Sequence, residues 1–217
     1  MINIAIDGYA GCGKSTTAQR VARELGYVYI DTGAMYRAMT LYLLENNIPY
    51  DEDNDALKEH LGKIYLEFSE ADECGNREIM LNDEKVESRI RTPEVSAAVS
   101  PVSTIVTVRR LLVAQQKRMA SRKGFVMDGR DIGTVVLPEA ELKVFMSADM
   151  DIRVDRRRQE LEAKGIDVTV INPGFVETDL TAKNDFPMPF LMKVDEAGDK
   201  IAEYCLQAKA ETHTECA

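Results

Sequence analysis

A phosphate-binding pattern lies close to the amino terminus. Residues 8–15 read Gly-Tyr-Ala-Gly-Cys-Gly-Lys-Ser, which fits G-x-x-x-x-G-K-[ST]. Its glycines let successive backbone N–H groups curl around phosphate oxygens, Lys14 reaches the outer phosphates, and the Ser15 hydroxyl can join a Mg²⁺ shell. A mere glycine turn with a solvated lysine is disfavoured, because an apolar run precedes the pattern and a helical period follows it. The predicted nucleotide-binding residues are Gly8, Tyr9, Ala10, Gly11, Cys12, Gly13, Lys14, Ser15 and Thr16.

A second polar segment, Asp128–Thr134, follows the apolar run Phe125–Met127. Open α/β sheets bind their ligands at the carboxyl ends of the strands. In that position, Arg130 offers a donor for a phosphate and Asp131 an acceptor for a base or sugar. Taken alone, the Asp-Gly pair is simply a good turn former, so both interpretations stay open.

Several arginines could supply further positive charge. Arg153, Arg156, Arg157 and Arg158 lie in one charged stretch, 150–164, that also holds many acids. These arginines either form ion pairs along the helix or stabilise charge on a transferring phosphoryl group. Arg37 and Arg109 would add further positive charge, but taken singly each arginine more often lies on a solvated face.

The chain places these residues on alternating strands and helices. The first 45 residues read as strand, helix, strand and helix, which predicts a parallel sheet covered on both faces. A Pro follows the Thr cap at the start of the long helical stretch. The expected elements are strand 2–6, helix 17–25, strand 27–30, helix 34–45, short antiparallel strands 64–68 and 78–81, a helical stretch from 92 to about 122 interrupted near Pro101, strands 125–127 and 142–146, and helix 150–164.

Composition narrows the function class. The 217 residues, 45% of them hydrophobic, can bury one core with a small lobe. A formal charge of -10 argues against a protein that wraps duplex nucleic acid. No apolar run is long enough to span a bilayer and no signal peptide is recognisable, so a cytoplasmic protein is expected. The four cysteines have no zinc-site spacing and are expected to be free thiols, and the two histidines predict neither a zinc site nor a triad.

Together these motifs resemble the bacterial cytidylate kinase family, ATP-dependent (d)CMP kinases of the P-loop nucleoside monophosphate kinase fold. The resemblance covers about residues 1–165 and rests on the phosphate loop, Asp31–Arg37, Ile90–Val95, Asp128–Thr134 and Arg153–Leu161, in family order. It implies an α/β fold, with a parallel sheet flanked by helices and a small antiparallel insertion. The implied division is a kinase core at 1–45 and 92–165, a nucleoside-monophosphate-binding insertion at 46–91, and an atypical segment at 166–217.

The resemblance also implies roles for individual residues. Ser100, Arg109 and Asp131 look like the family's cytosine-reading group, Arg37 and Arg130 resemble the residues that hold the CMP phosphate, and Thr32 occupies a substrate-side position. Lys14, Arg130, Arg153 and Arg157 form the implied catalytic set. The implied reaction converts CMP or dCMP to CDP or dCDP with ATP and Mg²⁺. A monomer is expected, with neither nucleic acid nor a membrane as partner.

The family pattern stops near Gly165. Residues 166–217 hold ten acidic and four basic residues, and no arginine follows Arg158. Residues of about 166–195 resemble a late segment of short-chain dehydrogenases, through Gly165–Thr178 and Met188–Phe190, so the chain looks like a join of two families. The last strand and the lid are therefore expected to be atypical, with Val168–Asn172 as the closing strand and Asp195–Ala210 as the closing helix.

Two other functions stay open. One is a nucleotide-binding protein with impaired or no turnover, because the family's lid arginines and final strand are replaced. The other is an NAD(P)-dependent oxidoreductase, suggested by the tail. It is disfavoured because the sequence has neither a Tyr-x-x-x-Lys pair nor a G-x-G-x-x-G after a strand.

Overall fold

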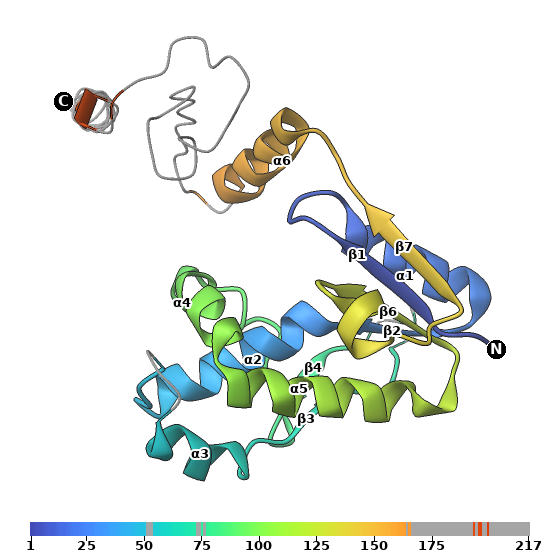
Figure 1. Ribbon diagram of the computed structural model, residues 1–217, viewed down its shortest axis with the longest axis horizontal. Helices are drawn as coiled ribbons and strands as arrows, with labels where there is room; N and C mark the ends of the chain where they lie inside the picture. Colours follow the sequence, from blue (N-terminus) through green and yellow to red (C-terminus); the bar gives the residue numbers. More distant parts are fainter. Residues whose placement is uncertain are drawn as a thin grey trace. The chain divides into compact units, whose positions relative to one another are not determined.

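The computed structural model describes residues 1–50, 54–72, 75, 77–163, 165, 193, 195, 196 and 199 (Figure 1). The chain divides into two units, 1–153 and 154–217, and each is described by itself. The strands are β1 (Ile4–Gly8), β2 (Val28–Asp31), β3 (Leu66–Phe68), β4 (Ile79–Leu81), β5 (Glu84–Lys85), β6 (Phe125–Gly129) and β7 (Leu142–Met146). The helices are α1 (Lys14–Leu25), α2 (Thr32–Glu45), α3 (Asp55–Leu61), α4 (Pro93–Thr104), α5 (Val106–Met119), the 3₁₀ turn η1 (Ala120–Arg122), the π-helix η2 (Ile132–Val136) and α6 (Met150–Glu162).

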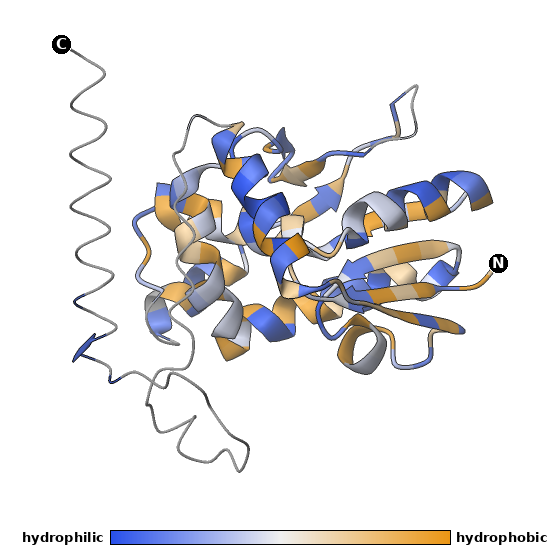
Figure 2. Cartoon of the chain, turned by 90° about the horizontal axis from the view of Figure 1, so that it is seen from above, coloured by the Kyte–Doolittle hydropathy of each residue, from blue (hydrophilic) through white to orange (hydrophobic). Residues whose placement is uncertain are grey.

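The main sheet is parallel, with the strand order β2-β6-β1-β7. Side chains alternate between its faces, so Ile4 and Ile6 pack with Ala18 and Ala22 of α1, whereas Ala5 joins the core on the opposite face. The helices in Figure 2 carry hydrophobic residues beside hydrophilic ones, as helices with one face on a core do. The predicted parallel sheet flanked by helices is confirmed. The chain leaves β1, β2 and β6 at one edge, and the phosphate loop, Thr32 and the Arg130–Asp131 pair follow those strands.

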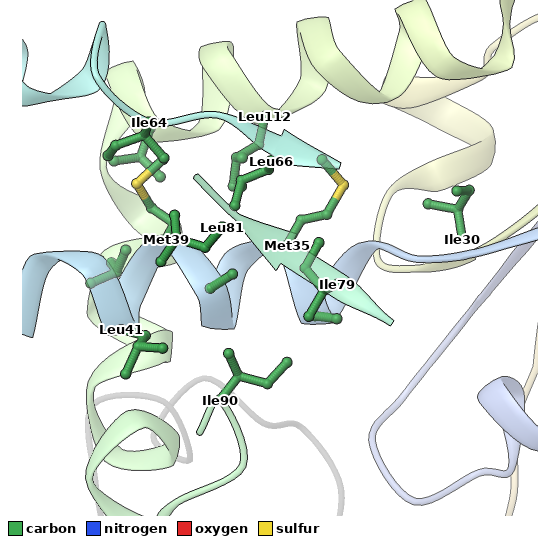
Figure 3. Close-up of a cluster of buried hydrophobic side chains, with 14 of the residues drawn as sticks. Ile30, Met35, Met39, Leu41, Ile64, Leu66, Ile79, Leu81, Ile90 and Leu112 are labelled. Carbon is green, nitrogen blue, oxygen red and sulfur yellow. The ribbon is translucent and has the colours of Figure 1, made fainter. Parts of the chain in front are cut away.

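A small antiparallel sheet, β3-β4-β5, completes the larger core. Leu66, Ile79 and Leu81 from this sheet are buried in one cluster with Met35 and Leu112 (Figure 3). The small antiparallel sheet of the predicted fold is thus confirmed, although α3 and the two-residue strand β5 were not expected. Both are short, and β5 exposes both residues, so neither leaves a long hydrophobic period in the sequence.

The long helical stretch breaks at Ile105 and not near Pro101 as predicted. Pro101 lies inside α4, where it removes one backbone donor. The axis turns by 93° between Pro93–Thr104 and Val106–Arg122. Ile105 has extended backbone angles and is only 6% exposed. The break therefore places an apolar side chain in the core. In the described part of the chain no single helix could span a membrane, and only this bent pair passes by length and composition.

Some expectations fall outside the described residues. The closing strand at 168–172 lies there, as does the closing helix at 195–210 apart from three positions. Cys12 is a free thiol as expected, while the other three cysteines also lie outside. The division of the chain at 45, 91 and 165 stays a prediction.

Candidate active site

The loop between β1 and α1 has the strand, loop and helix that phosphate binding requires. Gly13 caps α1 with a φ of 92°, a conformation that glycine adopts without strain. At Gly8 a Cβ atom would lie 2.0 Å from the carbonyl oxygen of Met146, so only glycine fits between β1 and β7. Lys14 Nζ donates a hydrogen bond to the Tyr9 carbonyl oxygen at 2.8 Å. The amino group is therefore held against the loop that would surround the phosphates.

Asp128 lies at the centre of the polar contacts beside this loop. Its Oδ2 accepts a hydrogen bond from Ser15 Oγ and its Oδ1 accepts one from Tyr29 Oη, both at 2.8 Å. Thr32 Oγ1 donates to its backbone oxygen, also at 2.8 Å. Asp128 is only 3% exposed. Side chains from α1, β2 and α2 are thus tied to one buried aspartate of β6.

Burial affects the ionisation of this group. Desolvation, and then the negative charge of Asp31, raises the pKa of Asp128 from 3.8 to about 6. Hydrogen bonds from Tyr29 and Ser15 and the charge of Lys14 act in the opposite direction. Burial also raises the pKa of Tyr29, helped by the charges of Asp31 and Asp128. The phenol therefore stays protonated and is the donor to Asp128.

Ser15 and Asp128 suit a divalent cation that is shared with nucleotide phosphates. The described residues hold no group of three or more His, Cys, Asp or Glu side chains arranged for a metal. Mg²⁺ needs no such cage, because it usually takes one or two protein oxygens, several waters and phosphate oxygens. Here a hydroxyl and a carboxylate oxygen lie 2.8 Å apart next to the phosphate loop. The donor set thus fits a magnesium ion that arrives with its nucleotide.

Replacing Asp128 with asparagine tests the raised pKa in the metal-free protein. Between the unfolded value of 3.8 and the folded value of about 6, the folded state binds the proton more tightly, so wild-type stability falls as pH rises through this window. Asparagine does not ionise, so this loss does not occur in the variant. Between pH ~4 and ~6 the free energy of unfolding of the variant, relative to that of wild type, should rise by up to about 3 kcal/mol. Urea unfolding in EDTA measures this. A difference between the two proteins that does not change with pH would contradict the assignment.

A second group lies after Gly129. Arg109 Nη2 and Asp131 Oδ2 form an ion pair at 2.7 Å. Burial raises the pKa of the nearby Tyr36 phenol, while the charge of Arg109 lowers this pKa and that of Asp131 raises it. Asp7 supports this turn, because its carboxylate accepts hydrogen bonds from the backbone of Ile132 at 2.6 Å and of Gly133 at 2.8 Å. The Arg109 and Asp131 side chains, distant in sequence, are thus paired beside the end of β6.

The remaining predicted substrate residues lie on the surrounding elements. Arg37 of α2 donates to Ser96 Oγ of α4 at 3.0 Å. Ser100 is an exposed residue of α4, and Arg130 is exposed next to Asp131. Thr32 is buried and bound to Asp128 as described. The structure brings Thr32 to Asp128 and Arg109 to Asp131. Among the described residues, the side chains of Ser100 and Arg130 have no hydrogen-bond or ion-pair partner.

The two predicted lid arginines differ in their surroundings. Arg153 Nε donates to the Ala10 carbonyl oxygen at 2.8 Å, and its guanidinium carbon lies 4.9 Å from the centre of the Tyr9 ring. Tyr9 in turn packs edge-to-face on Phe145 at 5.7 Å. Arg153 is therefore anchored on the phosphate loop within the first unit. Arg157 belongs to the second unit and forms an ion pair with Glu160 at 2.8 Å there.

Sequence reasoning missed the roles of Asp7, Tyr29 and Asp128. Asp128 carries a recognisable signal, since it is the first polar residue after the apolar run Phe125–Met127. Tyr29 carries none, because its contact depends on β2 lying next to β6. The role of Asp7 likewise depends on the placement of η2 against β1.

Known proteins match most of this chain in sequence. The profile of the family "Cytidylate kinase" matches residues 4–176. A cytidylate kinase of Bacteroides fragilis is 54% identical over 166 residues, which is 76% of this chain and 72% of that protein. One from Flavobacterium johnsoniae is 49% identical over 193 residues, covering 86% and 84%. A crystal structure from Thermus thermophilus covers 76% of this chain and 78% of its own at 20% identity and a TM-score of 0.32, too low to support an argument.

The profile continues past residue 165, where the motifs recognised in the sequence stop. Both relatives are about half identical to this chain, which covers more than two thirds of each of them. A phosphate loop, a parallel sheet and the family's segments in order agree with this match. The chain belongs to the cytidylate kinase family.

Proposed function

We propose that this chain transfers the γ-phosphoryl group of ATP to CMP or dCMP, with Mg²⁺ bound alongside ATP. The observation that carries the proposal is that the phosphate loop and the Arg109–Asp131 ion pair lie at one edge of a single sheet, in a chain of this family. The phosphate loop follows β1, and the Arg109–Asp131 pair lies beside the end of the adjacent strand β6. A donor nucleotide and an acceptor nucleotide can therefore meet at that edge.

The proposed division of labour follows the chemistry of each side chain. The loop N–H groups and Lys14 bind the outer phosphates of ATP, and Ser15 with Asp128 holds the magnesium ion. Bound there, the ion neutralises negative charge on the phosphates. Arg37 and Arg130 hold the phosphate of CMP, with Thr32 on the same side. Arg153 and Arg157 supply positive charge to the group in transfer.

The cytosine end is assigned to Arg109, Asp131 and Ser100. An aspartate accepts a hydrogen bond from the exocyclic amino group of cytosine, and an arginine donates to the ring acceptors. Uracil carries an oxygen in place of that amino group, so it offers Asp131 no donor at this position. The ion pair at 2.7 Å holds both side chains ready for this pattern.

The transfer itself needs positioning more than a strong base. An ionised oxygen of the CMP phosphate attacks the γ-phosphorus, and the bond to the bridging oxygen breaks, which leaves CDP and ADP. The attacking oxygen carries no proton that must be removed first. The residues therefore orient the two phosphates and neutralise charge, and no covalent enzyme intermediate forms.

The family match does not favour a nucleotide-binding protein without turnover. Arg153, whose side chain contacts the phosphate loop within the first unit, can also stabilise charge in the transition state. That the chain is a monomer without nucleic acid or membrane partners remains a prediction.

A coupled assay of ADP release with CMP, dCMP, UMP and AMP tests the proposal. We expect turnover with CMP and dCMP, and kcat/KM values for UMP and AMP lower by at least about 10²-fold, because a hydrogen-bonding site rejects analogues that leave its polar groups unpaired. Equal rates with all four nucleotides, or none with any, would overturn the proposal.

A further inference from the structure

The Tyr29 hydroxyl binds the one carboxylate that also holds the phosphate-loop serine. Tyr29 Oη donates to Asp128 Oδ1 and Ser15 Oγ donates to Asp128 Oδ2, each at 2.8 Å. Tyr29 is partly buried and packs in the cluster formed by β1, α1 and Val126. A phenol has one proton to donate, and here that proton is directed at a carboxylate only 3% exposed.

This arrangement fixes the Ser15 hydroxyl as well as the carboxylate. With one donor on each oxygen, the carboxylate plane cannot rotate without breaking one of two charge-assisted hydrogen bonds. The Ser15 proton points to Oδ2, so the lone pairs of Oγ are directed elsewhere and remain able to bind a cation. Without Tyr29, Oδ1 would lose the only side-chain donor that the described residues give it, and the carboxylate would be free to turn.

The position of Tyr29 follows from the sheet. In the β2–β6 register Asp31 is paired with Asp128 and Tyr29 with Val126. Because side chains alternate along a strand, Tyr29 and Asp31 lie on the same face as Asp128. The tyrosine reaches it diagonally from the neighbouring strand. Rigid strands, and no loop, thus set the distance between the phenol and the carboxylate.

We propose that Tyr29 is a positioning residue, which orients Asp128 and through it Ser15 for the magnesium ion that accompanies ATP. This inference rests on the proposed function and extends it to a residue outside the phosphate loop and outside the substrate-binding group. Partners that orient metal-binding side chains typically change metal affinity by about 10- to 100-fold when they are removed.

The test is Tyr29→Phe, which removes the hydroxyl and keeps the ring. The matched control is Tyr27→Phe. The Tyr27 hydroxyl lies at the start of the same segment and accepts a hydrogen bond from the Ile2 backbone N–H at 3.1 Å, away from Asp128. Electron paramagnetic resonance measures Mn²⁺ binding with ADP, and the ADP-release assay measures the free Mg²⁺ concentration that gives half-maximal rate at saturating CMP.

For Tyr29→Phe we expect both metal constants to rise by about 10-fold, with the KM for CMP within about two-fold of wild type. Tyr27→Phe should leave all three values unchanged. Unchanged metal constants in Tyr29→Phe would overturn the inference, even if the variant melts at a lower temperature. If wild type failed to phosphorylate CMP, the proposed function would fall, whereas Mn²⁺ binding would still decide the role of Tyr29.

Discussion

Replacing Lys14 with methionine is expected to lower kcat for CMP phosphorylation by about 10³-fold or more. Methionine has a similar length without the charge, so the change removes the only phosphate-loop cation and leaves the glycine backbone in place. In the structure Lys14 makes a hydrogen bond to the exposed end of its own loop, at the Tyr9 carbonyl oxygen. We therefore expect little loss of stability, which thermal unfolding can check.

Lys58→Met is the matched control. Lys58 forms an exposed ion pair with Asp55 at 3.3 Å on α3, and exposed pairs contribute little. The control should retain wild-type turnover. A Lys14→Met protein with more than about a tenth of wild-type kcat would show that the loop does not bind the reacting phosphates as proposed.

Replacing Asp131 with asparagine is expected to lower kcat/KM for CMP by about 10²-fold while changing that for UMP much less. Asparagine keeps the shape of the side chain but loses the negative charge that pairs with Arg109 at 2.7 Å. It also replaces one of the two acceptor oxygens, which could bind the cytosine amino group, with a donor NH₂ group. The CMP preference over UMP should therefore narrow. Steady-state kinetics with both nucleotides measure it.

The substitution avoids backbone strain. Asp131 has a φ of 58°, a left-handed conformation that asparagine tolerates. Asp83 has a φ of 68° in the turn between β4 and β5, so Asp83→Asn is a control with the same chemical change in a similar backbone. If the two variants discriminated CMP from UMP equally well, Asp131 would not read the base.

Much of the core could be predicted because its signals are local. The glycine pattern at 8–15, the apolar runs of β1 and β6 and the Thr92–Pro93 helix start each lie within a few residues. The break at Ile105 could not be predicted, because it depends on a buried position that only tertiary packing creates. Pro101 was the stronger local signal, and α4 tolerates it.

The candidate site divides in the same way. Lys14 and Ser15 are fixed by their own loop, so sequence alone placed them on it. The Tyr29–Asp128 and Arg109–Asp131 contacts join residues 99 and 22 positions apart. The first depends on β2 lying next to β6 and the second on the start of η2, and the sequence has no short-range pattern for either.

The most direct measurement is ³¹P NMR of the wild-type chain incubated with MgATP and CMP. The account predicts that the CMP resonance is lost as CDP appears, with ADP formed in equal amount and no inorganic phosphate. ADP formed together with inorganic phosphate and without CDP, or unchanged spectra after prolonged incubation, would contradict it.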